Sequence, residues 1–320
     1  MAFLQQFVAH LATTLKVLAD NLEEDILKTK DNMTKTTKTI IGRVVKAVAS
    51  KFFVDTESGV KVCFARKKLK FDGNIYVGDY VEIAKDRDVF VIEKVEDRKN
   101  QLIRPYVSNV DVCLIVIAPE PEPDFLLVDK VIVNCLVEGI EPVILANKCD
   151  ISKIDLSEYA SIVKCFEISA ETGFGVSAVF DYVKGRTVCL AGQSAVGKSS
   201  LINAILDSDE CEVGELAKKI KRGKNTTRRI EIYNLGGTYL MDTCGFSMLD
   251  AVDIEPESLR LYFDDLEVFR PECKFNTCTH INEPECAVKP HVGKEIGQGR
   301  YDRYKLIYDE LTERRKNKYE

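Results

Sequence analysis

Residues 192–199 read GQSAVGKS, and this stretch decides the fold of the chain. It follows the apolar run TVCLA and precedes SLINAIL, whose apolar residues have helical spacing. A strand, a GxxxxGKS loop and a helix in this order are typical of a phosphate-binding loop, because inward-turned backbone N–H groups and a helix N-terminus surround a diphosphate. The sequence therefore predicts an α/β domain that binds a nucleoside triphosphate.

The residue types in this loop predict specific contacts. Lys198 is expected to reach the β- and γ-phosphates, and the Ser199 hydroxyl is expected to bind a Mg²⁺ ion that accompanies the nucleotide. The residues predicted to contact the nucleotide along this loop are Gly192, Gln193, Ser194, Ala195, Val196, Gly197, Lys198, Ser199 and Ser200.

Two motifs outside the loop predict which base is bound. The first is NKCD, residues 147–150, at the end of a predicted strand; the Asp150 carboxylate can accept hydrogen bonds from N1–H and the 2-amino group of guanine, which adenine cannot offer. The second is SAETGFG, residues 169–175, where the Ala170 N–H is expected to contact guanine O6. The predicted base-side contacts are Asn147, Lys148, Cys149, Asp150, Ser169 and Ala170, so the expected ligand is GTP.

A third strand end carries YLMDTCG, residues 239–245, and supplies a DxxG pattern. Asp242 is expected to contact the ligands of the Mg²⁺ ion rather than the ion itself. The Gly245 N–H is expected to donate a hydrogen bond to the γ-phosphate. Upstream, Thr226 and Thr227 lie in the basic sequence GKNTTRR, and we assign Thr227 to Mg²⁺ coordination while the γ-phosphate is present. These residues predict a nucleotide-dependent switch.

The order of these motifs differs from that in ordinary Ras-like GTPases, in which the phosphate loop comes first and the base-reading loops come last. Here the guanine motifs, residues 147–150 and 169–175, precede the phosphate loop, and the switch residues follow it. This order indicates a circularly permuted domain. Whatever follows Gly245 is then attached directly to the γ-phosphate sensor.

The remaining sequence predicts further domains. Residues 1–38 are expected to form an amphipathic helical extension, to which we assign no function, and residues 39–105 contain five short β-rich runs that predict a small β-barrel, with Leu102–Pro105 as an exit linker. Residues 106–255 alternate strands and helices, which predicts a parallel sheet with helices on both faces. The expected helices are 125–138, 157–164, 176–183 and 198–206, followed in residues 256–320 by helices at 256–269 and 301–318.

The last region also contains a cluster of potential metal ligands. Three thiols and one imidazole, from Cys273, Cys278, His280 and Cys286, give the four soft ligands of a closed structural Zn²⁺ site. A redox pair is less favoured because no CxxC spacing occurs, and His291 ranks below His280 as the nitrogen ligand. We expect one zinc ion per chain.

Composition and charge narrow the class of protein. The formal net charge of −6 disfavours a generic nucleic-acid binder, yet Arg66, Lys67, Lys68 and Lys70 gather in one stretch of the predicted barrel, and residues 218–229 carry only basic charges. Apolar runs are too short to span a bilayer, and the N-terminus lacks a basic start and a cleavage site. We therefore expect a cytoplasmic protein without membrane contact, and a monomer.

Taken together, the motifs resemble those of RsgA, also called YjeQ or YloQ, a family of circularly permuted bacterial GTPases. The resemblance runs from about Ile40 to the C-terminus and is carried by GRVVKAV, YVGDYVEI, DRKNQLIRP, NKCD, GQSAVGKSSLIN, GKNTTR, DTCGF and CxFxxCxHxxEPxCAV. It implies an N-terminal OB-fold, a permuted P-loop GTPase domain and a C-terminal zinc-binding domain. It also implies GTP hydrolysis in maturation of the small (30S) ribosomal subunit, with rRNA as a partner.

The chain departs from the family pattern at two places. The leader, residues 1–38, has no counterpart, and Asn225 stands where the family has a histidine proposed to be catalytic. Phe246 follows Gly245, where Ras-like enzymes place a water-orienting glutamine, so we expect slow intrinsic hydrolysis that the small subunit stimulates, with Asn225 orienting the water.

Two other functions fit the motifs less well. One is a nucleotide-gated RNA-binding module with negligible turnover, and the other is a metabolic NTPase that holds a small substrate in the barrel. A metabolic enzyme needs a further catalytic acid or base, and the whole chain has only 3 histidines. GTP turnover with and without small subunits would separate these alternatives.

Overall fold

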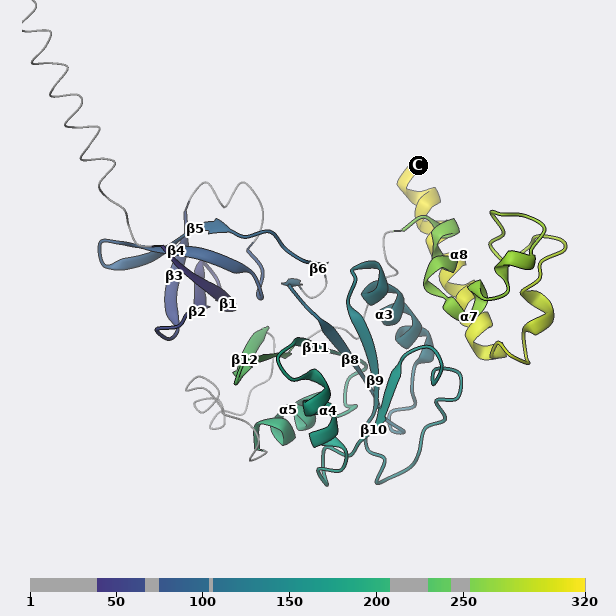
Figure 1. Cartoon of the computed structure of the whole chain (residues 1–320), viewed down its shortest axis with the longest axis horizontal. Coiled ribbons are helices and arrows are strands. Elements are labelled where there is room, and N and C mark those ends of the chain that lie inside the picture. Colours follow the sequence, from purple (N-terminus) through teal and green to yellow (C-terminus); the bar gives the residue numbers. More distant parts are fainter. Residues whose placement is uncertain (1–38, 67–74, 104–105, 208–229, 243–253, 320) are drawn as a thin grey trace, which may run out of the picture.

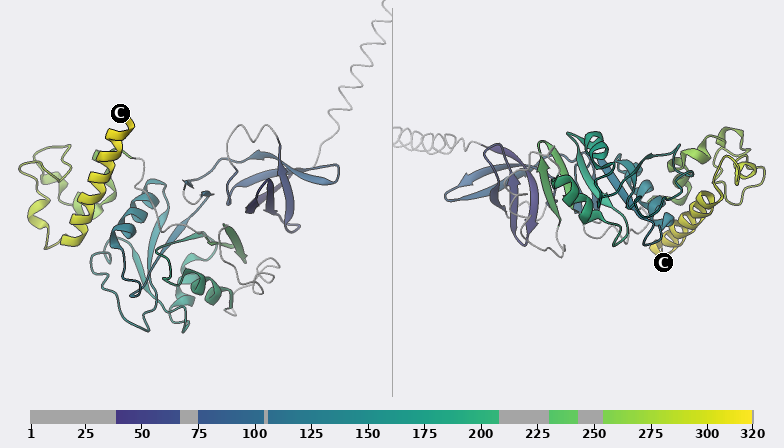
Figure 2. Two further views of the ribbon diagram at one scale, coloured as in Figure 1. Left: turned by 180° about the vertical axis from the view of Figure 1, so that it is seen from behind. Right: turned by 90° about the horizontal axis from the view of Figure 1, so that it is seen from below.

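The structure is a computed structural model that describes residues 39–66, 75–103, 106–207, 230–242 and 254–319. A β-barrel, a central α/β domain and a C-terminal helical domain follow one another in a row, as Figure 1 and Figure 2 show from three directions. Among the described residues, no helix is both long and apolar enough to cross a membrane. The predicted N-terminal helix lies outside the described residues.

The first domain is a closed barrel of five strands. Strand β1 (Ile40–Val48) pairs with β2 (Lys51–Asp55), β2 with β3 (Lys61–Ala65), β3 in parallel with β5 (Val89–Val95), and β5 with β4 (Tyr80–Asp86). Pairing of β4 with β1 closes the barrel. Its core consists of small and branched side chains: Val44, Val54, Cys63, Val81, Ile83 and Ile92. This is the five-stranded arrangement of an OB-fold, which confirms the predicted barrel.

The described part of the linker that we predicted at Leu102–Pro105 belongs to a strand. Strand β6 (Gln101–Ile103) pairs with β7 (Tyr106–Ser108) in a separate two-stranded sheet. The Leu102 and Val107 side chains are buried and belong to the apolar core beneath one face of the central α/β domain.

The central sheet has the strand order β10-β9-β8-β11-β13-β12. The strands are β8 (Val112–Ile117), β9 (Glu141–Ala146), β10 (Lys164–Glu167), β11 (Thr187–Ala191), β12 (Glu231–Leu235) and β13 (Thr238–Asp242). All neighbouring pairs are parallel except the β12–β13 hairpin. Helix α3 (Phe125–Val137) packs on one face, and α4 (Val176–Val183) and α5 (Lys198–Asp207) pack on the other. The predicted parallel sheet with helices on both faces is confirmed.

The helix predicted at residues 157–164 is wrong. Residues 157–162 form turns, in which the N–H groups of Ala160 and Val163 donate to Leu156 O and Tyr159 O, and β10 begins at Lys164. Only seven residues separate Leu156 from Lys164, and both Glu158 and Tyr159 are engaged by the C-terminal domain, so tertiary contacts override the local helical pattern.

The C-terminal domain is built around helix α8 (Gln298–Tyr319), which starts three residues before its predicted position. The single helix predicted at 256–269 is instead two short ones, the 3₁₀ helix η1 (Pro256–Tyr262) and α7 (Asp264–Glu267). The break falls at Phe263, whose backbone is not helical (φ −124°, ψ 75°) and whose buried ring packs edge-on against Tyr304. Two further 3₁₀ turns follow, η2 (Arg270–Glu272) and η3 (Lys289–His291).

The barrel meets the α/β domain along strand β1, which we call the barrel seam. Lys46 of β1 pairs with Glu231 of β12, and this pairing joins the barrel to the central sheet. The buried Arg43 guanidinium donates to Thr187 Oγ1 at 2.7 Å, to Asn109 O at 3.0 Å and to Gly78 O at 3.2 Å. Its acceptors are all uncharged oxygens, and burial lowers the pKa of Arg43.

The C-terminal domain meets the α/β domain between α3 and α8, which we call the helical seam. The fully buried Asp129 carboxylate on α3 accepts from Arg300, from Arg303 Nε at 2.5 Å and from the Tyr159 hydroxyl at 2.8 Å. Arg303 also donates to Glu158 Oε2 at 2.9 Å. Two arginines of α8 are therefore neutralised by acids from the α/β domain, inside the protein.

Candidate nucleotide and metal sites

The predicted nucleotide motifs meet at one edge of the central sheet. NKCD follows β9, SAETG follows β10, the phosphate loop follows β11, and Asp242 ends β13. Because these strands run parallel, their carboxyl ends lie at the same edge. Strands β8 and β11 are neighbours although β9 and β10 come between them in the chain, and such a switch in strand order is where open α/β sheets bind ligands.

The phosphate loop depends on two glycines in conformations that L-residues avoid. Gly192 has φ 125°, and a Cβ there would lie 2.1 Å from Val116 O. Gly197 has φ 95°, and a Cβ there would lie 2.3 Å from Asn147 Nδ2. The Lys198 ammonium folds over the loop and donates to Gly192 O at 2.7 Å. The Lys198 ammonium therefore lies over the backbone groups of the loop, where a diphosphate would bind.

Two side chains of NKCD tie the base-reading loops to the phosphate loop. The buried Asn147 donates from Nδ2 to Val196 O at 2.8 Å and accepts from the Ala170 N–H at 2.9 Å. Lys148, with φ 61°, donates to Ala195 O at 3.0 Å. Three loops that are far apart in sequence thus form one connected edge, from which the Asp150 side chain is exposed to solvent.

The Ala170 amide is used differently from our expectation. It donates to Asn147 Oδ1, so in this geometry the donor assigned to guanine O6 is already engaged within the protein. Ser169 is fully buried and its hydroxyl accepts from the Thr172 N–H at 3.2 Å, which shapes the same loop. The assignment of Ala170 to guanine O6 therefore stays a prediction that requires this amide to share or change its acceptor.

Sequence reasoning missed the segment after β8, which borders the phosphate loop. Gln193 donates to Glu122 O at 3.2 Å and accepts from the Asp124 N–H at 3.1 Å, and Lys148 donates to Glu120 O at 2.5 Å. The segment was identifiable in principle, because it follows a fully buried strand that neighbours β11.

Asp242 lies where the DxxG prediction requires it, at the carboxyl end of β13. Burial raises the pKa of this carboxyl, Glu231 raises it further, and the Lys198 ammonium lowers it. Four other residues of the predicted nucleotide site lie outside the described residues: Asn225, Thr226, Thr227 and Gly245. Their predicted roles in catalysis and in Mg²⁺ binding are untested.

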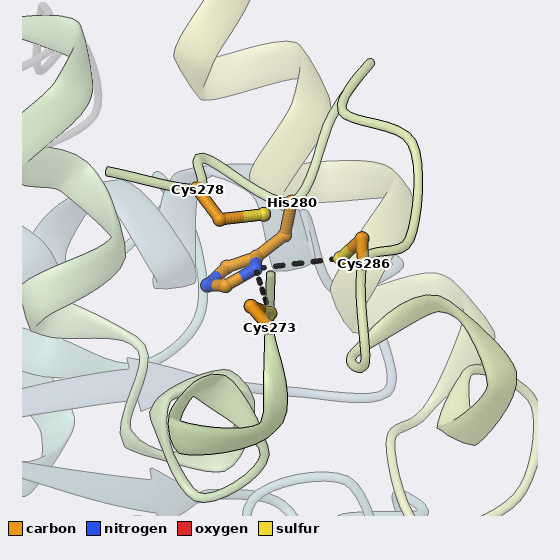
Figure 3. A group of neighbouring side chains, drawn as sticks. All are labelled: Cys273, Cys278, His280 and Cys286. Carbon is orange, nitrogen blue, oxygen red and sulfur yellow. Dashed lines mark hydrogen bonds between the residues drawn. The ribbon is translucent and has the colours of Figure 1, made fainter. Parts of the chain in front are cut away.

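The predicted metal ligands come together in the C-terminal domain. The ligand atoms of Cys273, Cys278, His280 and Cys286 all lie within 4.8 Å of one another, and Figure 3 shows the imidazole among the three thiols. His280 Nδ1 lies 3.5 Å from Cys286 Sγ and 3.7 Å from Cys273 Sγ. A tetrahedral Zn²⁺ site with ordinary Zn–S and Zn–N bonds has S···N edges of about 3.6 Å, so these residues fit a zinc ion.

The surrounding residues hold this cluster in shape. Glu283 accepts from the N–H groups of Thr279 and Ile281, and these hydrogen bonds outweigh burial and lower its pKa to about 2. They stabilise the turn that keeps His280 at φ 64°. Burial lowers the pKa of His280, which favours the neutral imidazole that a metal ion binds. Burial raises the pKa of the Cys278 thiol to about 12, so a cation is needed to hold this side chain as a thiolate.

His291 lies apart from this cluster, in accordance with its lower rank. Its ring stacks on Phe269 with centroids 3.7 Å apart, and its Nδ1 lies 3.1 Å from Glu295 Oε2. The other imidazole nitrogen of His280, Nε2, is buried 3.8 Å from Glu267 Oε1, which is too far for a hydrogen bond.

The basic cluster predicted on the barrel is described at one position only. Arg66 is exposed and pairs with Glu93 at 2.5 Å, and Lys67, Lys68 and Lys70 lie outside the described residues. The barrel surface as a contact for RNA is therefore still a prediction.

The fold and site together define a circularly permuted P-loop GTPase that carries a barrel before the nucleotide domain and a cysteine–histidine domain after it. A family model, RsgA GTPase, matches residues 95–252. The small ribosomal subunit biogenesis GTPase RsgA of Caldanaerobacter subterraneus is 40% identical over 88% of this chain and 98% of its own length. The RsgA of Agathobacter rectalis is 37% identical over 86% and 99%. The chain belongs to the RsgA family.

Solved structures agree with this assignment. YjeQ from Thermotoga maritima superposes with a TM-score of 0.71 at 33% identity, covering 86% of this chain and 99% of that one. YloQ, described as a circularly permuted GTPase, superposes with a TM-score of 0.70 at 30% identity, covering 88% and 98%.

Proposed function

We propose that this protein hydrolyses GTP to GDP and phosphate while it assists late maturation of the small ribosomal subunit. The observation that carries the proposal is the connected edge of three loops, in which Asn147 and Lys148 bond to the phosphate loop. The chain that carries this edge belongs to a family whose curated members are named small ribosomal subunit biogenesis GTPases.

The nucleotide roles are part of this proposal. Lys198 contacts the β- and γ-phosphates, Asp150 reads guanine, and Ser199 and Thr227 coordinate Mg²⁺ with the support of Asp242. Thr226 and the Gly245 N–H sense the γ-phosphate, and Asn225 orients the attacking water. Mg²⁺ supplies charge neutralisation at the phosphates, while the chain's own groups position the nucleotide.

The direct test is GTP turnover by the full chain with and without purified small subunits. We expect slow hydrolysis by the protein alone and clear stimulation by the subunits, since Phe246 replaces the water-orienting glutamine. Turnover that is equally fast without subunits would contradict a subunit-dependent GTPase. Absence of turnover in both arms, with GTP still bound, would favour the nucleotide-gated binding module.

Guanine recognition has its own test in Asp150→Asn. The change replaces an acceptor by a donor, which suits the 2-oxo group of xanthine, so GTP affinity should fall and xanthosine triphosphate affinity should rise. The exposed Asp181→Asn on α4 serves as the control. Unchanged GTP affinity together with no gain for the xanthine nucleotide would show that Asp150 does not read the base.

The metal and the subunit contacts complete the proposal. The four-residue cluster holds one structural Zn²⁺ per chain. The protein acts as a monomer, and its barrel and C-terminal domain contact rRNA. Elemental analysis should find one zinc ion, and chelation should lower the melting temperature while GTP affinity largely survives, because the nucleotide edge lies in another domain. A metal-free protein with an unchanged melting profile would rule out the structural role.

A further inference from the structure

The β12–β13 hairpin lies between the two segments to which the proposed function assigns nucleotide sensing. Thr226 and Thr227 precede β12, and β13 ends at Asp242, just before Gly245. The open end of the hairpin is therefore attached to both sensing segments along the chain, and its closed end is the turn at Gly236 and Gly237. A displacement of either segment acts first on the open end.

At this open end Glu231 stands between two charged partners. It is paired directly with Asp242 across the hairpin, and directly with Lys46 of the barrel across the seam. The Lys46 ammonium forms an ion pair with the Glu231 carboxylate. Like charges directly opposite each other in a sheet destabilise the pairing, so Lys46 offsets the repulsion between Glu231 and Asp242.

The connection between β1 and β12 is the weakest pairing of the large sheet. The register of β1 with β12 covers the single pair Lys46–Glu231, whereas β12 and β13 share five residue pairs. The Lys46 and Glu231 side chains are 26% and 14% exposed, and ion pairs that contact solvent contribute little to stability. We therefore expect that this ion pair can break while the strand pairings within the barrel and within the hairpin stay intact.

Further contacts between hairpin and barrel lie at both ends. Near the open end, Val45 shares a buried apolar cluster with Ile232 and Met241, and a Cβ at Gly78 would lie 3.0 Å from Met241 Cε. Asn234 donates to Asp55 Oδ2 on β2 at 3.0 Å, and the Arg43 guanidinium lies 4.4 Å from the centre of the Tyr239 ring. Asn234 and Tyr239 are paired with each other, one step from the turn. The hairpin is thus anchored by polar contacts near its turn, and at the open end the Lys46–Glu231 ion pair adds to the apolar packing of Ile232 and Met241.

We infer that the Lys46–Glu231 ion pair passes the position of the hairpin's open end to the barrel, with Glu231 as a positioning residue between Asp242 and β1. The inference deepens the proposed function and rests on it, because it requires the sensing segments to differ between GTP and GDP. The consequence is that the barrel occupies different positions in the two nucleotide states.

The test compares Lys46→Met, Glu231→Gln and the double variant of the full chain with wild type. The control is Lys94→Met, which removes a cation from an ion pair within the barrel, 58% exposed and away from the seam. Hydrogen exchange of the β1 amides is measured with a non-hydrolysable GTP analogue and with GDP. Affinity for the analogue and the melting temperature are measured alongside, to show that each variant folds and binds.

In wild type the exchange rates of the last β1 amides should differ at least about fivefold between the two nucleotides, the lower end of ordinary coupling. Each single variant should bring this ratio close to one, and the double variant should do no more, because both changes remove the same contact. Lys46→Arg and Lys94→Met should keep the wild-type ratio. A wild-type ratio in both single variants would overturn the inference.

Small-subunit affinity in the two nucleotide states separates this inference from the proposed function. Loss of the nucleotide-dependent difference in affinity in the single variants would support the inference. Wild-type protein that shows the exchange difference but never binds small subunits would contradict the proposed function and leave the coupling supported. Wild-type protein that binds subunits but shows no exchange difference would overturn the coupling alone.

Discussion

The two seams of the molecule connect the GTPase domain to its neighbours by different means. The helical seam encloses a fully charged network in which Asp129 and Arg300 are both almost inaccessible to solvent. The barrel seam has a buried arginine with uncharged acceptors and a partly exposed ion pair at its edge. A buried charge that loses its partner destabilises the protein strongly, because water cannot replace the partner. The two charges of an exposed pair can separate at little cost in free energy, because water solvates each of them. The C-terminal domain is therefore held firmly, and the barrel seam contains a contact that can open.

The largest effect is expected from breaking the helical seam with Asp129→Ala. The change leaves Arg300 and Arg303 without their shared carboxylate inside the protein, so the free energy of unfolding should fall by about 3–5 kcal/mol. Denaturant unfolding measures this loss, and Asp181→Ala on the exposed side of α4 is the matched control. A loss no greater than that of the control would mean that the network is not a firm connection.

A smaller effect is expected from Arg43→Met at the centre of the barrel seam. The substitution leaves three oxygens short of a donor but strands no opposite charge, so the loss should be about 1–3 kcal/mol. The control is Lys85→Met at an exposed position of β4. If Arg43→Met destabilised the protein more than Asp129→Ala, the ranking of the two seams would be reversed.

The smallest effect is expected from Lys46→Met at the edge of the barrel seam. Its cost in free energy of unfolding should stay below about 1 kcal/mol at low salt. This cost should shrink further in about 1 M salt, because screening reduces the range of the interaction between exposed charges to about 3 Å. Unfolding of wild type and variant at both salt concentrations decides the point. A cost of several kcal/mol that is independent of salt would show that the ion pair behaves as a buried one.

The nucleotide edge was predictable from sequence because its residues act through local geometry. A GxxxxGKS loop between a strand and a helix needs its two glycines for backbone conformations that the structure also has, at φ 125° for Gly192 and φ 95° for Gly197. The spacing from Cys273 to Cys286 likewise brought the four ligand atoms within 4.8 Å of one another. Period-two and period-3.6 patterns predicted the barrel strands and the helices α3, α4, α5 and α8 for the same reason.

Other features were decided by the tertiary structure. Residues 157–162 are turns because Glu158 and Tyr159 bond to α8, which is about 140 residues away in sequence. The Ala170 amide donates to Asn147 because folding brings β9 and β10 side by side. The partners of Arg43, Asp129 and Glu231 are likewise far from them along the chain. Local sequence determines which backbone shapes and ligand types are available, but the pairing of distant charges depends on which elements pack together, and no local pattern encodes that choice.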